Sequence, residues 1–186
     1  MDSLSQPSYE PRAMLPVAPR SELTCWYAIQ TRTRHEKKAA AQLQEKGVVT
    51  FLPLIAQTRR WSDRRKVIQP PLFPCYAFVR LPPSVEARLV VVQTRGVVGI
   101  VGAHGVGTPI PDSQIDSIQT LLAQNVNCSL SPFLKFGQRV RIRGGCLDGI
   151  EGILRGQNGD RSLVVSIELI QRSVAVRIDG YDLEMV

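Results

Sequence analysis

The stretch that decides the fold is Pro71-Leu72-Phe73-Pro74-Cys75-Tyr76-Ala77-Phe78-Val79-Arg80, an aromatic segment opened by prolines. Its residue types favour a β-strand over residues 75–81. Side chains in a strand alternate between two faces, so Tyr76 and Phe78 share a face that Phe73 does not. We therefore expect some large aromatic surface to point away from the main core. That surface is either a contact site or a second, well-buried face of the strand.

The flanking segments predict a mixture of strands and helices. Residues 26–30 are typical of a first strand, and Thr33-Arg34-His35-Glu36 matches the capping box that begins a helix. Gly47 can end that helix. We expect its inward stripe to be Ala39, Ala40 and Leu43.

Other elements are expected further along the chain. They are strands over 51–57 and 97–101, a basic hairpin tip at 58–66, a short helix over 85–93, a glycine-rich loop over 102–109, and a helix capped by Asp112 with Ile115, Ile118 and Leu122 on one face.

The positive charge is concentrated in about one fifth of the chain. The formal net charge is +7, and residues 32–66 hold ten Lys or Arg against three acids, a difference of 10 − 3 = 7 that equals the whole excess. Such clustering favours a polyanionic partner, because lysine and arginine that neutralise phosphates release counterions. A solvated charged face is the alternative for any single lysine.

The pattern changes after residue 132, from mixed helices and strands to short strands alone. Residues 139–143 and 174–178 alternate apolar and polar side chains, and Asn158-Gly159 is a strong hairpin signal. About 50 residues of this kind suggest a small barrel. Its charges nearly cancel, with eight basic residues against seven acidic ones from Lys135 onward. We expect this part to contact protein rather than nucleic acid.

Several functional classes find no support in the sequence. The four cysteines are far apart, and His35 and His104 are the only histidines, so we expect neither a zinc site nor a disulfide framework. Motifs for phosphate-binding loops, serine nucleophiles and metallohydrolases are absent. We expect no enzymatic activity and no cofactor. No apolar run approaches the roughly 20 residues that span a bilayer, so we expect a cytoplasmic protein that does not bind membranes.

Four motifs in order make the chain similar to the NusG family of transcription elongation factors. They are Trp26-Tyr27, the segment from Pro71 to Val79, Thr94-Arg95-Gly96-Val97 followed by Pro109-Ile110-Pro111, and the stretch 137–186. The resemblance implies an α+β protein. Its parts are a disordered tail (1–22), an NGN domain with an antiparallel sheet flanked by helices (23–124), a flexible linker (125–132) and a KOW β-barrel (133–186).

Leu-Phe-Pro-Cys-Tyr and Thr-Arg-Gly are closer to the specialised RfaH and UpxY paralogues than to housekeeping NusG, in which Gly usually follows Phe-Pro. The implied function is therefore transcription antitermination at specific operons, by a monomer that suppresses pausing or termination. In the family, an apolar hollow accepts the clamp helices of the largest RNA polymerase subunit. The residues that correspond to it here are Tyr27, Leu54, Phe73, Pro74, Tyr76 and Phe78.

Specialised members of the family also contact the non-template DNA strand in the transcription bubble. Arg32, Gln42, Lys46, Thr94 and Arg95 correspond to that contact, and we add Arg34, His35 and Lys38. Glu45 departs from the pattern, since an acid there would repel phosphate. In the KOW domain, Ile167, Leu169, Ile170 and Arg172 correspond to the edge that binds either Rho or a small-subunit ribosomal protein. We expect this domain to remain a barrel.

An alternative interpretation is a KOW-containing ribosomal or structured-RNA-binding protein. It predicts tight RNA binding in the absence of polymerase. A structural adaptor whose basic and aromatic features have no function is a second alternative. In that case, charge reversal of Arg32 or Arg95 would leave elongation unaltered.

Overall fold

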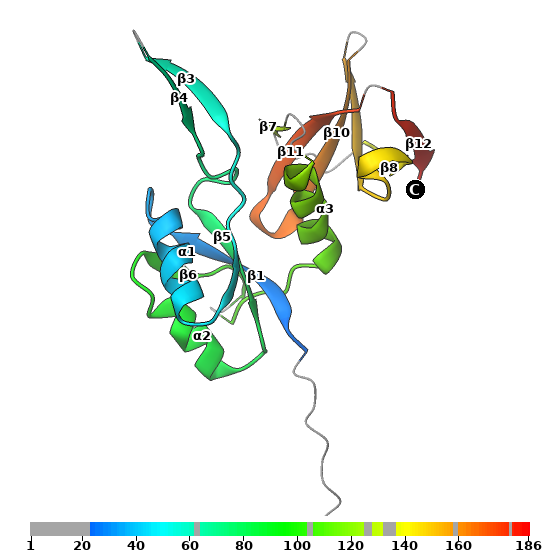
Figure 1. The fold of residues 1–186 in the computed structure, drawn as a ribbon. Coiled ribbons are helices and arrows are strands. Elements are labelled where there is room, and N and C mark those ends of the chain that lie inside the picture. Colours follow the sequence, from blue (N-terminus) through cyan, green and yellow to red (C-terminus); the bar gives the residue numbers. More distant parts are fainter. Residues whose placement is uncertain are drawn as a thin grey trace, which may run out of the picture.

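The computed structural model describes residues 23–61, 64–103, 106–124, 128–131, 137–157, 160–178 and 180–186, with backbone alone described at 58–61, 64–66, 157 and 160. The elements form two antiparallel sheets, a two-stranded ribbon and three α-helices, an α+β arrangement (Figure 1). The Asn158-Gly159 turn and His104 lie outside the described residues. No helix in the described ranges is long and apolar enough to cross a bilayer.

The first sheet has the strand order β2-β5-β1-β6. Its strands are β1 (Cys25–Thr31), β2 (Val49–Phe51), β5 (Tyr76–Leu81) and β6 (Val97–Ile100), and its helices are α1 (Glu36–Glu45), α2 (Val85–Val92) and α3 (Asp112–Ala123). The alternation predicted for residues 75–81 is confirmed. The strand β5 lies beside β1 in the sheet. Its successive side chains belong to the apolar clusters on opposite faces of that sheet.

Each face of this sheet is covered. On one face, Tyr27 and Ile29 pack with Leu43 of α1 and Val91 of α2. The other face, with Trp26, Ala28 and Phe78, belongs to a cluster that includes Ile115, Ile118 and Leu121 of α3. Strand residues alternate between the two faces of the sheet, so the aromatic side chains of Trp26 and Phe78 lie on the face opposite α1. The helix α3 covers that face and buries them. It uses Leu121 as its third buried position, where the sequence suggested Leu122, which is half-buried.

Two predicted helix caps are wrong. The helix α1 begins after His35, and neither His35 nor Thr33 caps it through a side chain. Arg34 takes a left-handed conformation (φ 65°), so the chain enters the helix two residues later than the capping box requires. The helix α3 begins after Pro111, and Asp112 is its first residue, held by an ion pair with Arg80 at 3.1 Å.

The strand expected over 51–57 is divided in the structure. Phe51 ends β2, and Gln57 begins β3 (Gln57–Trp61), which pairs with β4 (Arg64–Ile68) in a ribbon of its own. The basic segment 58–66 therefore includes strand residues of both arms, where a hairpin tip was expected.

The second sheet has the strand order β12-β8-β9-β10-β11-β7, as expected from the strand-rich C-terminal sequence. Its strands are β7 (Cys128–Ser131), β8 (Gln138–Arg143), β9 (Glu151–Gln157), β10 (Asp160–Ile167), β11 (Arg172–Arg177) and β12 (Asp182–Met185), with short 3₁₀ helices η2 (Gly145–Leu147) and η3 (Glu168–Ile170). β7 lies inside the span 125–132, where a linker was expected. Its backbone completes the sheet by pairing with β11.

Candidate nucleic-acid and protein interfaces

A polar pocket of about 250 Å³ lies between α1 and the loop that follows α2. It is lined by His35, Lys38, Gln42 and Arg95. The first three residues recur at i, i+3 and i+7, so a single helix presents them on one face. The pocket thus brings together four of the eight residues that sequence reasoning assigned to nucleic-acid binding.

Backbone packing fixes the wall of the pocket that carries Arg95. Gly96 has φ 97°, and a Cβ at this position would lie 3.0 Å from Cβ of His35, so both the conformation and the space favour glycine. The Arg32 N–H donates to the Gly96 carbonyl at 2.8 Å. These contacts hold the loop of Arg95 against the start of α1.

The ring of His35 has a defined orientation. Its Nδ1–H donates to the Thr33 carbonyl at 3.1 Å. A carbonyl oxygen can only accept, so the neutral ring carries its proton on Nδ1 and leaves Nε2 as an acceptor. With Lys38 and Arg95 as cationic donors and the Gln42 amide as donor and acceptor, the pocket can bind a phosphate or a base edge.

Thr94, which was also predicted to contact nucleic acid, makes hydrogen bonds within the protein. It is buried, and its hydroxyl donates to the Val90 carbonyl at 2.8 Å while accepting from Lys46 Nζ at 2.8 Å. With both of these bonds made inside the protein, Thr94 orients Lys46. Arg32 and Arg34 are exposed but do not line the pocket.

The six residues predicted to form an apolar hollow do not lie on one surface. Tyr27 is on the face of the sheet covered by α1 and α2, opposite Phe78. Phe73 and Phe78 are fully buried in the cluster that includes α3, with ring centroids 6.1 Å apart in an edge-to-face contact. They are therefore core residues in this conformation.

The remaining three residues form what we call the apolar rim. Pro74 is exposed, and Leu54 and Tyr76 are half-buried. The backbone of Leu54 bridges to Pro71, and Tyr76 packs against the cluster that holds Phe73. The rim is the part of the predicted hollow that a partner can reach.

Glu36, which sequence reasoning did not select, connects the rim to the pocket. It is buried, and its Oε1 accepts from the Cys75 N–H at 2.9 Å. Cys75 has φ 67°, and its carbonyl accepts from the Thr31 N–H at 2.8 Å. The turn that carries the rim is thus anchored beside His35. The sequence alone held no signal for this role, because it depends on a contact with a residue 39 positions away.

The residues predicted for the KOW partner differ in exposure. Ile167 and Ile170 are buried, Leu169 is half-buried and Arg172 is exposed. The N–H of Glu168, within this segment, donates to Gln114 Oε1 of α3 at 3.2 Å. One end of the second sheet therefore contacts the helix that covers the first.

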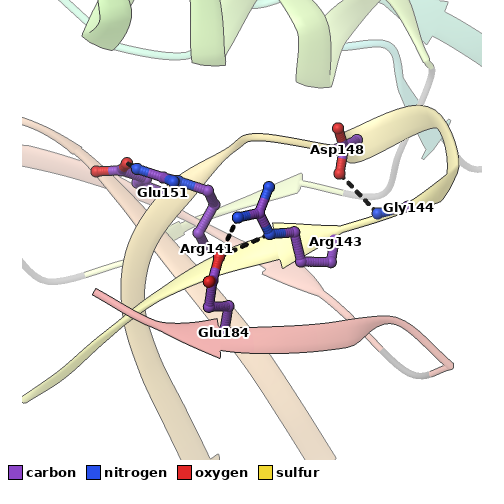
Figure 2. A network of polar contacts seen from close by, with 6 residues as sticks. All are labelled: Arg141, Arg143, Gly144, Asp148, Glu151 and Glu184. Carbon is purple, nitrogen blue, oxygen red and sulfur yellow. Dashed lines mark hydrogen bonds and ion pairs between the residues drawn. The ribbon is translucent and has the colours of Figure 1, made fainter.

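Acids on neighbouring strands partner two arginines of β8, as Figure 2 shows. Arg141 Nε donates to Glu151 at 2.8 Å, and that hydrogen bond raises the pKa of Arg141. Arg143 Nε donates to Glu184 at 2.6 Å. Local pairing of this kind leaves little net field, which agrees with the expectation that nucleic acid binds elsewhere.

A larger pocket, of about 800 Å³, lies between α3 and the second sheet. The start of α3 lines it with Pro111, Ser113 and Gln114, and the second sheet contributes Arg139 and Glu151 among other residues. The described residues hold no group of three or more His, Cys, Asp or Glu placed to bind a metal ion.

Comparison with known proteins gives matches over most of the chain. A family model described as "Transcription termination factor nusG" matches residues 24–119, slightly more than half of the chain. A protein named "Transcription termination/antitermination protein NusG" from Lactococcus lactis is 27% identical over 171 residues, covering 86% of this chain and 91% of its own length. The protein of the same name from Borreliella burgdorferi is 25% identical over 181 residues, covering 87% and 98%. A solved structure titled "Domain interaction in Thermotoga maritima NusG" aligns with a TM-score of 0.48 at 20% identity, covering 82% of this chain and 92% of that one.

Proposed function

The chain belongs to the NusG family of transcription termination and antitermination factors, and from this premise we propose that it binds elongating RNA polymerase and the displaced non-template DNA strand. The observation that carries the proposal is the pocket of His35, Lys38, Gln42 and Arg95. Its donors converge within the part of the chain that the family model matches.

The pocket suits a single-stranded nucleotide better than a duplex. Its volume of about 250 Å³ is small compared with a DNA duplex. An unpaired base exposes its hydrogen-bonding edges, which Gln42 and Arg95 can bind, while Lys38 neutralises a phosphate. Lys46, oriented by Thr94, adds a third cation to Lys38 and Arg95.

The apolar rim is the proposed polymerase contact. Leu54, Pro74 and Tyr76 offer accessible apolar surface, and the hydrogen bond from the Cys75 N–H to Glu36 ties the turn of Pro74 and Tyr76 to the start of α1. Buried Phe73 and Phe78 support the rim from inside. A protein anchored on polymerase by the rim would present its pocket to the nearby exposed strand, and so favour continued elongation.

Leu-Phe-Pro-Cys-Tyr and Thr-Arg-Gly support the further proposal that the factor acts at specific operons. Nascent-transcript sequencing with and without the factor tests this. Readthrough confined to a few long operons is expected, and a genome-wide change would contradict it.

A reconstituted elongation complex tests the two contacts separately. Replacing Lys38 and Arg95 by Gln should weaken crosslinking of the non-template strand while polymerase binding persists. Tyr76→Ala should weaken polymerase binding itself, with a thermal melt showing that the protein remains folded. Arg155→Gln with Arg161→Gln is a matched control, because it removes two exposed charges from the second sheet. Equal crosslinking by the pocket variant and this control would refute the DNA contact.

A further inference from the structure

The strand β7 forms one edge of the second sheet with little support from its own side chains. It stands at the end of the strand order, where its four residues pair with β11 from Ser173 to Val176. None of the four is β-branched or aromatic, the residue types enriched in strands. The backbone pairing with β11 is therefore the main interaction that holds β7 in the sheet.

The apolar side of β7 fills the core incompletely. Leu130 is opposite Val174, and directly opposed residues share a face of the sheet. Val174 is fully buried in the apolar cluster, whereas Leu130 is 54% exposed. Cys128, which lies on the same face two residues earlier, is half-buried against that cluster. The apolar surface beside β11 is thus only partly covered by β7.

The other side of β7 carries a polar defect. Ser131 is opposite Ser173, whose hydroxyl pairs with the Ser166 hydroxyl at 2.7 Å. The Ser131 hydroxyl is buried and has no hydrogen-bond partner among the described residues. A buried polar group without a partner costs stability, so a strand with a small apolar residue at this position would pair better with β11.

We propose that the edge of β11 is a docking site for an extended segment of another protein, and that β7 covers this edge until that segment displaces it. In binding by strand addition, main-chain hydrogen bonds supply affinity and alternate side chains supply specificity. A strand with β-branched residues at the positions of Cys128 and Leu130, and alanine at that of Ser131, would remove both defects. Such a strand would compete with β7 for the same backbone groups.

The charge beside this edge indicates one further feature of the partner. Arg172 is exposed and directly precedes the paired residues of β11. Because the incoming strand is antiparallel, its residue after the position of Ser131 lies across from Arg172. An acid there would form a cross-strand pair of opposite charge. The expected ligand is therefore an extended segment with alternating apolar residues and an acid at its C-terminal end.

This site is separate from the surfaces of the proposed function. The pocket is built by α1 and the loop after α2, and the apolar rim lies beside the first sheet. The site also differs from the predicted KOW contacts, since Ile167 and Ile170 are buried side chains and the new contact is made by the main chain of residues 173–176. The inference does not depend on the proposed function.

A disulfide that locks β7 in place tests the proposal on the full chain. Ser129→Cys with Ala175→Cys puts cysteines at directly opposed positions, where a Cα separation of about 4.5–5.5 Å permits a disulfide. Cys128→Ala removes the neighbouring thiol. The probe is the fluorescein-labelled peptide Thr-Val-Thr-Ile-Ala-Glu, followed by fluorescence anisotropy. We expect the reduced protein to bind it, and oxidation to lower the affinity by more than about tenfold, because the locked protein offers no free edge. Reductant should restore binding.

Three controls separate strand addition from other binding. Cys128→Ala alone should bind the peptide equally with and without reductant. The peptide Val-Ile-Ala-Thr-Thr-Glu keeps the composition but loses the alternation, and it should bind more weakly. Lysine in place of the terminal glutamate should also weaken binding, because it faces Arg172. Equal binding of the original peptide to the oxidised and reduced proteins, or binding to neither, would overturn the proposal, as would equal binding of the rearranged peptide.

Hydrogen exchange on the unmodified chain gives a result that does not require the cysteine variant to fold. The peptide should speed exchange at the β7 amides, which leave the sheet, while the β11 amides stay protected by the incoming strand. Unchanged exchange in β7 at saturating peptide would overturn the proposal. Because neither polymerase nor DNA is present in these experiments, failure here would leave the proposed function standing.

Discussion

At the residue scale, Cys75 occupies a backbone conformation that suits glycine. Its φ of 67° is in the left-handed region, where a β-branched side chain is a steric outlier. Cys75→Gly should therefore leave the free energy of unfolding unchanged or raise it by up to about 1 kcal/mol, whereas Cys75→Val should lower it by about 1–3 kcal/mol. Urea unfolding measures both. Equal stability of the two variants would show that the turn relaxes to accept any side chain.

Individual site residues were predictable where one helix presents them together. Gln42 was selected through the family resemblance, and His35 and Lys38 share its face at helical spacing. The roles of Thr94 and Glu36 did not follow, because each depends on a partner about 40 residues or more away in the chain, Lys46 for Thr94 and Cys75 for Glu36. Sequence spacing carries no information about such a tertiary contact. The residues that position a site are therefore harder to find than those that line it.

At the element scale, the two N-terminal helices begin differently, and the difference predicts contrasting mutations. The Ser84 hydroxyl accepts from the Ala87 N–H at 3.2 Å and caps α2. Thr33 makes no cap to α1. Ser84→Ala should thus cost about 1 kcal/mol of stability, as lost caps usually do, and Thr33→Ala should cost less than about 0.5 kcal/mol, the usual limit for surface changes.

Chemical denaturation of both variants, followed by far-UV circular dichroism, compares the two costs directly. Ser84→Ala removes a hydroxyl group in front of a helix, and Thr33→Ala removes a hydroxyl and a methyl group in front of another, so each serves as a comparison for the other. An equal cost for Thr33→Ala would mean that the capping box forms in solution.

The elements themselves were more predictable than their ends. The period of the apolar residues identified α1, α3 and β5, because burial of one face dictates that period. The starts of α1 and α3 were misplaced, since Arg34 and Pro111 change the path of the chain before each helix. The strand β7 was missed altogether. Its short Cys-Ser-Leu-Ser sequence has weak periodicity, and only pairing with β11 orders it.

At the scale of the whole molecule, α3 joins the two sheets. Its inner side shares one apolar cluster with Trp26 and Phe78 of the first sheet and with Leu163 and Val165 of the second. In the first turn of α3, Gln114 accepts a hydrogen bond from the N–H of Glu168, which lies between β10 and β11. Sequence analysis placed a domain boundary just after this helix. The apolar cluster crosses that predicted boundary.

Because one cluster spans both sheets, unfolding should be a single cooperative event, and Ile118→Ala should weaken both sheets together. Ile118 is buried, so the substitution leaves a cavity that typically costs about 2–5 kcal/mol. Trp26 fluorescence reports mainly on the first sheet, with a Trp61→Phe background to remove the ribbon signal, and the Glu168 amide resonance reports on the second. Both should lose their native signal at one denaturant midpoint, shifted equally by Ile118→Ala.

Ser113→Ala, at an exposed position of the same helix, is the matched control and should shift neither midpoint. Separate midpoints, with only the first moved by Ile118→Ala, would mean that the sheets fold independently and that the contact through α3 contributes little free energy to either.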